Sequence, residues 1–223
     1  MTGPGALALV GEGEWTPSCS FDEELLLASG GDVVTVLPTA AAYERPAEAA
    51  AAAVTHFARW GARVEVLDAL NRSGAHDPDN VNRLRAARFV YLASGSAMHL
   101  LSVLKATPLW EALVAAHQDG AVLAAAGSSA TVVCDAMVDP RGGGFGVGLG
   151  LVKDLSLIPR YEQWSTEKSR RTIQMAPKGL VLAGVPAHSA LLRARDGRWR
   201  AVGADGLRLF RDGRPVAIDV LNG

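Results

Sequence analysis

A short serine-containing segment is the part of the sequence best suited to chemistry. An apolar run over residues 121–126 meets Gly127, Ser128 and Ser129, and a second apolar run follows. This pattern is typical of a buried strand that turns sharply into a helix. Gly127 tolerates the strained backbone of such a turn, so we expect Ser129 at the apex. The hydrolase pattern G-x-S-x-G presents a serine nucleophile in this way, although Thr131 here replaces the last glycine.

A serine nucleophile needs a base within hydrogen-bond reach, which in turn is oriented by a third group. His99 follows a turn of small residues after a predicted strand, and His188 ends a later strand or loop. Either could be a base at the turn, although a lone histidine is more often structural. The remaining histidines, which we expect to be partly solvated helix or loop residues, are His56, His76 and His117.

The sequence offers little to other chemistries. Cys19 and Cys134 have no metal-like spacing, and we expect Cys134 to be a buried apolar cysteine within the helix after the turn. The glycine-rich segment 141–150 lacks the lysine of a phosphate loop, so we expect a flexible connection there. We therefore predict no metal site and no cofactor.

The elements that would position these residues indicate an α/β fold. Five apolar, strand-like runs alternate with helical patterns, as expected for a mostly parallel sheet covered on both faces. After residue 140 a strand at 152–158 and a helix at 165–175 precede short runs broken by Asp-Gly dipeptides at 196, 205 and 212. Such dipeptides favour hairpins, so we expect antiparallel strands closing the edge of the sheet. The predicted strands are 6–10, 32–37, 63–67, 89–93 and 121–126, and the helices between them are 21–29, 47–60, 77–87, 98–104 and 107–118.

The bulk properties predict a single soluble domain over residues 1–223. A net charge of −1 gives no electrostatic reason to expect nucleic acid or an anionic membrane as a partner. The sequence contains no run of about 18 apolar residues and no basic segment before the first apolar run, so we expect a cytoplasmic protein without a signal peptide or membrane span. A homodimer is the default expectation.

The order of elements over residues 6–212 resembles that of the cyanophycinase and dipeptidase E (α-aspartyl dipeptidase) family of serine peptidases. Residues 126–130 (AGSSA) resemble the family's G-x-S-A-G-A, and residues 91–101 (YLASGSAMHLL) resemble its strand and loop ending in G-G-x-Q. Residues 148–151 (GLGL) resemble the G-L-G-L that precedes the catalytic histidine. The resemblance implies a three-layer αβα sandwich of the class I glutamine-amidotransferase-like type with flavodoxin-like topology. It also implies Ser129 as nucleophile, with an oxyanion hole near Gly95 and Ala130.

The sequence departs from the family where the chemistry should lie. The family's D-x-H-F falls on residues 158–161, which places Arg160 at the position of the expected histidine base. Arginine stays protonated and cannot accept a proton from serine, although its guanidinium could bind a carboxylate ligand. Ala97 stands where the G-G-x-Q glutamine is expected.

Two hypotheses about function follow. In the first, which the missing histidine and glutamine favour, a catalytically impaired member of the family binds a small molecule, a short peptide or a partner. In the second, an active hydrolase cleaves small peptides or esters with Ser129, using His99 or His188 as a relocated base. A nucleotide-binding flavodoxin-like module is a third class, but the sequence has no phosphate-loop signature to support it.

Overall fold

The computed structural model describes residues 3–139, 141 and 143–223. Residue 142 of the predicted glycine-rich connection lies outside the described part. Residues 1 and 2, at the start of the segment in which we expect no signal peptide, also lie outside it.

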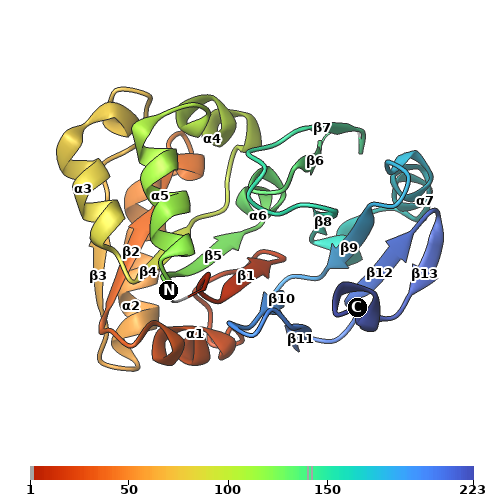
Figure 1. Cartoon of the computed structure of the whole chain (residues 1–223), viewed down its shortest axis with the longest axis horizontal. Coiled ribbons are helices and arrows are strands. Elements are labelled where there is room, and N and C mark those ends of the chain that lie inside the picture. Colours follow the sequence, from red (N-terminus) through yellow and green to blue (C-terminus); the bar gives the residue numbers. More distant parts are fainter. Residues whose placement is uncertain (1–2, 140, 142) are drawn as a thin grey trace.

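A seven-stranded sheet forms the centre of the larger half of the molecule, in the order β11-β10-β1-β5-β4-β2-β3 (Figure 1). Five neighbouring strands of this sheet, β1, β5, β4, β2 and β3, pair in parallel, as the sequence predicts for βαβ units. β10 pairs antiparallel with β1, and β11 with β10. The strands are β1 (Leu7–Val10), β2 (Val33–Leu37), β3 (Arg63–Val66), β4 (Phe89–Leu92), β5 (Val122–Ala126), β10 (Ser189–Arg193) and β11 (Trp199–Gly203).

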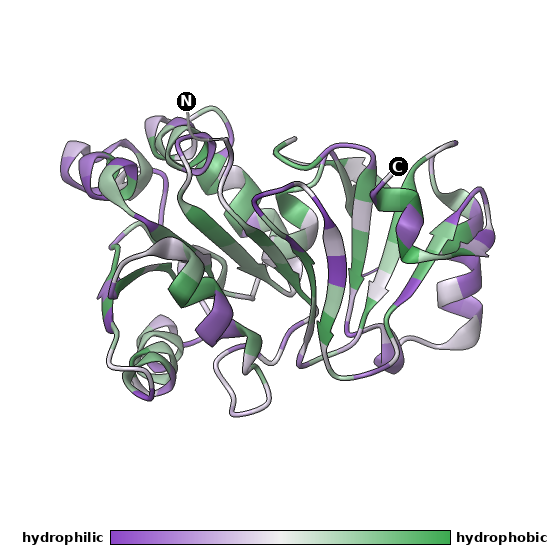
Figure 2. Cartoon of the chain, turned by 60° about the horizontal axis from the view of Figure 1, so that its bottom comes forward, coloured by the Kyte–Doolittle hydropathy of each residue, from purple (hydrophilic) through white to green (hydrophobic). Residues whose placement is uncertain are grey.

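Helices cover both faces of this sheet, and the central strands are hydrophobic along their length (Figure 2). Because neighbouring residues of a strand point to opposite faces, β1 contributes to two cores. Leu9 packs in the cluster that contains Leu100, whereas Val10 packs in the cluster that contains Leu25 and Phe57. The covering helices are α1 (Phe21–Ser29) and α2 (Pro46–Ala58) on one face, and α3 (Pro78–Ala86), α4 (Ala97–Leu104) and α5 (Pro108–Gln118) on the other.

A second sheet of four strands, in the order β13-β12-β9-β8, forms the smaller half. β8 and β9 are parallel, and β12 pairs antiparallel with both β9 and β13. The prediction that the late strands close one sheet is therefore only partly correct: β10 and β11 do so, but β12 and β13 join the second sheet. The elements of this half are β8 (Leu155–Pro159), η3 (Tyr161–Gln163), α7 (Thr166–Met175), β9 (Val181–Val185), β12 (Arg208–Arg211) and β13 (Arg214–Val216).

The Asp-Gly dipeptides explain this difference. Those at 196 and 212 form the predicted hairpin turns, between β10 and β11 and between β12 and β13. The dipeptide at 205 instead lies where the chain passes from one sheet to the other. The glycine-rich segment also differs from expectation, because part of it forms β7 (Phe145–Val147), which pairs antiparallel with β6 (Ala136–Val138).

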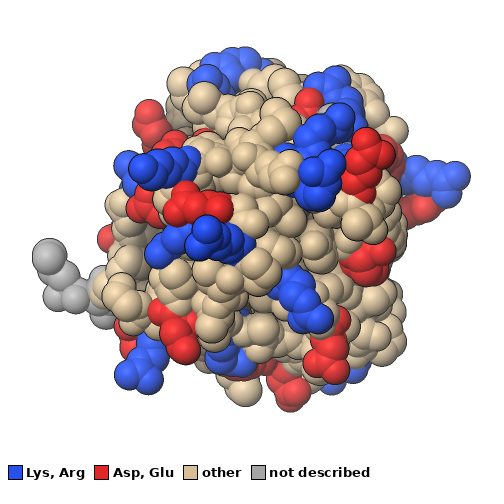
Figure 3. All heavy atoms as spheres, turned by 90° about the vertical axis from the view of Figure 1, so that its right-hand side faces the viewer, with Lys and Arg blue, Asp and Glu red and all other residues tan. Residues whose placement is uncertain are grey.

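The predicted fold class is confirmed: a mostly parallel sheet lies between helical layers, with antiparallel strands at the C-terminal end. No helix among the described residues is both long and apolar enough to cross a membrane. On the side of the molecule that carries α7 and the β12–β13 hairpin, basic and acidic side chains are interspersed (Figure 3).

Candidate functional site

The turn between β5 and the short helix α6 (Ser128–Val132) has Gly127 at its strained position. Gly127 has φ 52° and ψ −119°, a backbone conformation that residues with a side chain rarely adopt. Its N–H donates to the carbonyl of Val10, which fixes where β5 ends. The expectation that Ser129 stands at the apex is therefore wrong: Gly127 occupies that place.

Ser129 lies inside the protein, where it links the turn to the residue after β4. Its side chain is fully buried, and its hydroxyl donates to the carbonyl oxygen of Ala93 at 2.5 Å. The neighbouring Ser128 hydroxyl donates to the carbonyl of Gly95 and accepts the Gly95 N–H at 3.1 Å. The two serines thus bind the turn to the loop that follows β4.

The side-chain volume at Gly127 is already filled. A Cβ added to Gly127 would lie 2.2 Å from the Ser94 hydroxyl oxygen and 3.3 Å from Cγ of Glu12. Both distances are shorter than ordinary van der Waals contact. Ser94 therefore takes the space into which a residue at the apex would project.

A charged corner surrounds this position, formed by the loops after β1, β4 and β8. Arg160 forms an ion pair with Glu12, and the side chains are 52% and 27% exposed. The Ser94 hydroxyl donates to Glu12 Oε1 at 3.4 Å, and the Ser94 N–H donates to the Glu14 carboxylate at 2.8 Å. The backbone N–H of Arg160 donates to the carbonyl of Gly11 at 3.0 Å, which ties the second sheet to the first.

Burial sets the electrostatics of the two glutamates. Loss of hydration raises the pKa of Glu12, and the Arg160 charge opposes this rise without cancelling it. Burial also raises the pKa of Glu14, against the hydrogen bond from the Ser94 N–H. Both carboxyl groups therefore hold a proton to a higher pH than a free glutamate does.

The two histidines proposed as bases make other contacts. His99 donates from Nε2 to the carbonyl of Leu70 at 2.8 Å and packs edge-on against Tyr43. His188 Nδ1 lies 3.1 Å from both Thr16 Oγ1 and the Gly13 carbonyl. No hydrogen bond within the described part of the chain joins a histidine to the buried hydroxyl at position 129. The catalytic assignments of that serine, His99 and His188 stay predictions, which this geometry disfavours.

The backbone groups predicted to bind an oxyanion are used within the protein. The Gly95 N–H is bound by the Ser128 hydroxyl, and the Ala130 N–H donates to the Gly127 carbonyl at 3.2 Å. Arg160, the third predicted ligand-binding residue, does reach the corner, through Glu12. Its side chain is about half exposed to solvent there.

Two histidines expected on solvated helix faces are instead buried. His56 bonds Asp22 through Nε2 at 2.9 Å, and both side chains are almost inaccessible. His117 donates from Nδ1 to the Ala121 carbonyl and accepts a hydrogen bond from Arg193. The apolar residues beside them on α2 and α5 carry these imidazoles into the core.

Both cysteines are buried and free, as expected for Cys134. Burial raises the pKa of the Cys19 thiol to about 11 and that of Cys134 to about 12, so neither is an activated nucleophile. Within residues 3–139, 141 and 143–223, no group of three or more His, Cys, Asp or Glu side chains is placed to hold a metal ion.

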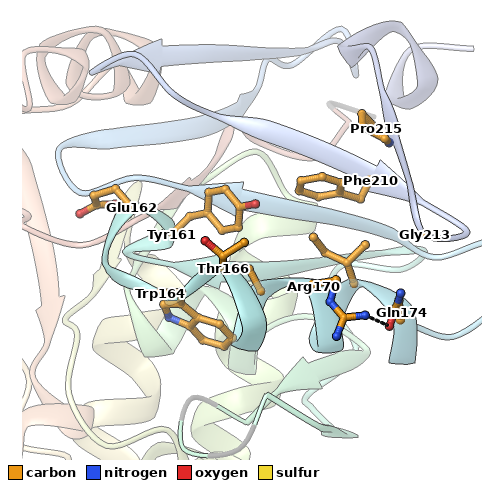
Figure 4. Close-up of a pocket in the computed structure, with 11 residues that line it drawn as sticks. Tyr161, Glu162, Trp164, Thr166, Arg170, Gln174, Phe210, Gly213 and Pro215 are labelled. Carbon is orange, nitrogen blue, oxygen red and sulfur yellow. Dashed lines mark hydrogen bonds between the residues drawn. The ribbon is translucent and has the colours of Figure 1, made fainter.

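A cavity of about 550 Å³ is lined by Tyr161, the residue that follows Arg160 in the sequence (Figure 4). Its polar rim includes Glu162 and Arg170, and the rings of Tyr161 and Phe210 lie on the same side of it, with centroids 6.0 Å apart. The Tyr161 ring rests on Gly184 of β9, where a Cβ would meet the ring at 2.5 Å. The cavity thus lies beside the charged corner and against the second sheet.

Sequence reasoning missed the parts of the corner that come from other loops. Glu12 and Glu14 follow the first predicted strand in a turn-like segment, and Ser94 follows the fourth. The available signal was topological, because parallel strands present their carboxyl ends at one edge of the sheet. Applied to β1, β4 and β5, that rule would have placed the three side chains beside Gly127.

Comparisons with known proteins agree with this architecture. The model of peptidase family S51 matches residues 8–197. A peptidase from an acI-B1 actinobacterium superposes with a TM-score of 0.86 at 23% identity, covering 96% of this chain and 94% of that one. A putative peptidase E protein from Listeria monocytogenes EGD-e superposes with a TM-score of 0.61 at 19% identity, over 93% and 98%. No curated protein matches the sequence. Because the family match covers most of its length, the chain belongs to peptidase family S51.

Proposed function

We propose that this protein keeps the family S51 scaffold without serine–histidine peptidase catalysis, and that it binds a small molecule or short peptide at the corner around Gly127. One observation carries the proposal: the strained position of the turn holds a glycine, which offers no nucleophile. The buried hydroxyl of Ser129 supports it, since that oxygen donates to the Ala93 carbonyl and has no hydrogen bond to a basic side chain within the described part of the chain.

The charges of the corner favour a zwitterionic ligand. The half-exposed Arg160 guanidinium is suited to a carboxylate, which it can bind through two parallel hydrogen bonds. Glu12 and Glu14 provide acceptors for an amine a short distance away. A dipeptide carries both groups on a small frame.

The neighbouring cavity gives the ligand room for an apolar side chain. Tyr161 follows Arg160 directly in the sequence, and its ring and that of Phe210 form part of the cavity lining. Aromatic rings in that arrangement favour a flat or branched apolar group.

Calorimetric titration with a panel of dipeptides, aspartyl dipeptides included, tests this proposal when the same mixtures are assayed for hydrolysis. We expect binding without turnover. Arg160→Ala should weaken binding by about 10- to 100-fold, because hydrogen bonds to charged groups contribute roughly 1.5–3 kcal/mol. Arg85→Ala, a half-exposed arginine that pairs with Asp119, is the matched control and should leave affinity unchanged. Hydrolysis that disappears in Ser129→Ala would overturn the proposal.

A further inference from the structure

We infer that Ser94 is a nucleophilic serine that attacks activated esters, with the Glu12 carboxylate as its proton acceptor. Its hydroxyl oxygen lies 2.2 Å from where the Cβ of a residue at position 127 would stand. The turn therefore retains a serine hydroxyl in the space beside its apex, supplied by the loop after β4 rather than by the end of β5. This acyl transfer goes beyond the binding role proposed above.

The hydroxyls of the three serines near the turn have different partners. Those of Ser128 and Ser129 donate to the carbonyls of Gly95 and Ala93, which leaves their protons engaged with groups that are not bases. The hydroxyl of Ser94 faces a carboxylate instead, in a partly exposed position. Its 3.4 Å separation from Glu12 is long, as catalytic hydrogen bonds often are before a substrate binds.

Glu12 is held in place as a base must be. Arg160 pairs with its carboxylate, and the Glu12 carbonyl accepts the N–H of His188 at 2.8 Å. The Glu14 carboxylate binds the Ser94 N–H and so fixes the loop that carries the nucleophile. Nucleophile, base and orienting group thus form one connected set, which is the arrangement that activates a serine.

The reaction balances without a cofactor. The Ser94 oxygen forms a bond to the acyl carbon of the ester while its proton passes to Glu12. The bond from the acyl carbon to the leaving oxygen breaks, and Glu12 returns the proton to that oxygen. Water then cleaves the acyl–Ser94 ester by the same proton path, which regenerates the free hydroxyl.

Labelling with a fluorophosphonate, followed by peptide mapping in a mass spectrometer, tests the identity of the nucleophile. The Ser94 oxygen would bond to phosphorus as fluoride leaves, so we expect one adduct on the peptide that contains Ser94. Ser94→Ala should abolish it, whereas Ser129→Ala and the exposed-loop control Ser18→Ala should retain it. Absence of an adduct on the folded wild-type protein, or an adduct on another residue, would refute the inference. Because this readout follows Ser94 and the dipeptide assay follows Ser129, the two proposals fail independently.

The rate of labelling tests Glu12. Glu12→Gln should slow it by about 100-fold or more, the range typical of general-base catalysis, with an unchanged melting temperature as evidence of folding. With p-nitrophenyl acetate as substrate, Ser94→Ala should release no burst of nitrophenol. Ser94→Cys, which keeps a nucleophile in place, should release one. An unchanged rate in Glu12→Gln would remove Glu12 from the mechanism.

A pH profile separates a base from a merely structural carboxylate. The rate should rise as Glu12 ionises, with a midpoint above the 4.5 of a free glutamate because burial raises its pKa. Besides Arg160, the carboxylates of Glu14, Glu44 and Glu162 face Glu12, and His188 packs on the same loop. Because the arginine charge lowers the pKa, Arg160→Met should move the midpoint upward. A profile with no rising limb would contradict the role of Glu12.

Discussion

Two acid–base pairs on the loops and helices around β1 contain similar chemistry and have opposite surroundings. Asp22 and His56 are hydrogen-bonded at 2.9 Å with side chains 0% and 1% exposed, whereas Glu12 and Arg160 are 27% and 52% exposed. By residue type the buried pair is the better catalytic dyad. It is nevertheless closed to substrate, so access to solvent rather than residue type distinguishes the candidate site from the core.

The aromatic residues around the buried pair explain why it is closed. His56 lies edge-on to Phe57 and Trp60, and Phe57 in turn contacts Phe89 and Tyr91. A pair enclosed in this way contributes to structure, because a lone carboxylate in the same place would lack its hydrogen bond. The open pair is partly exposed to solvent, so its ion pair contributes less to stability.

The largest expected effect that tests this comparison is on stability. His56→Ala should lower the free energy of unfolding by about 3–5 kcal/mol, because it leaves Asp22 buried without its partner. Arg160→Ala, its counterpart in the open pair, should cost less than about 1 kcal/mol, since exposed ion pairs contribute little. Urea unfolding of both variants measures the contrast, and equal losses would show that the two pairs do not differ as described.

A second effect separates the strained turn from an ordinary glycine. Gly127→Ala should destabilise the protein by about 1–3 kcal/mol, the usual cost of a residue held in a rarely populated conformation, and its methyl group would also overlap Ser94. Adding Ser94→Gly should recover the part due to overlap. Gly144→Ala, at a glycine with no atom within 4 Å of an added Cβ, is the control and should be nearly neutral in the same unfolding assay.

The smallest effect is a pH dependence of stability that belongs to the buried pair. Burial raises the pKa of Asp22, against the opposing effect of His56. The folded protein therefore holds a proton that the unfolded chain has released, and stability falls as pH rises from 3.8 through the raised value. Asp22→Asn removes this titration, so the stability of the wild type relative to the variant should decline over that interval. Burial also raises the pKa values of Glu12 and Glu14, so thermal melts should be repeated in Glu12→Gln and Glu14→Gln. A difference that does not change with pH would contradict the assignment.

Much of the fold was predictable because local patterns and the core agree. The run DVVTVL has apolar residues on both faces, which predicts the covered parallel strand β2 (Val33–Leu37). The second sheet was not predictable in this way. The late strands carry the same apolar pattern whichever sheet they join, and the choice depends on how the chain crosses after Val185 and after Gly203.

The site was harder to predict for a local and a global reason. Three small residues, Gly127 to Ser129, could each have taken the strained position, and only the place where β5 ends decides between them. Two residues along a helix rotate a side chain by about 200°, which turns Ser129 to the opposite side of the turn. The partners Glu12 and Ser94 then follow from the order of strands in the sheet, which differs from their order in the sequence.

The close approach of Ser94 to Gly127 also constrains how this sequence can change. Side chains at both positions would compete for one volume, so a serine at 127 requires a smaller residue at 94. A lineage that moved the hydroxyl from one loop to the other by single substitutions would have avoided that clash by passing through a protein with glycine at both positions. Such an intermediate has no hydroxyl in the volume next to position 127, and its descendants could then acquire a serine on either side.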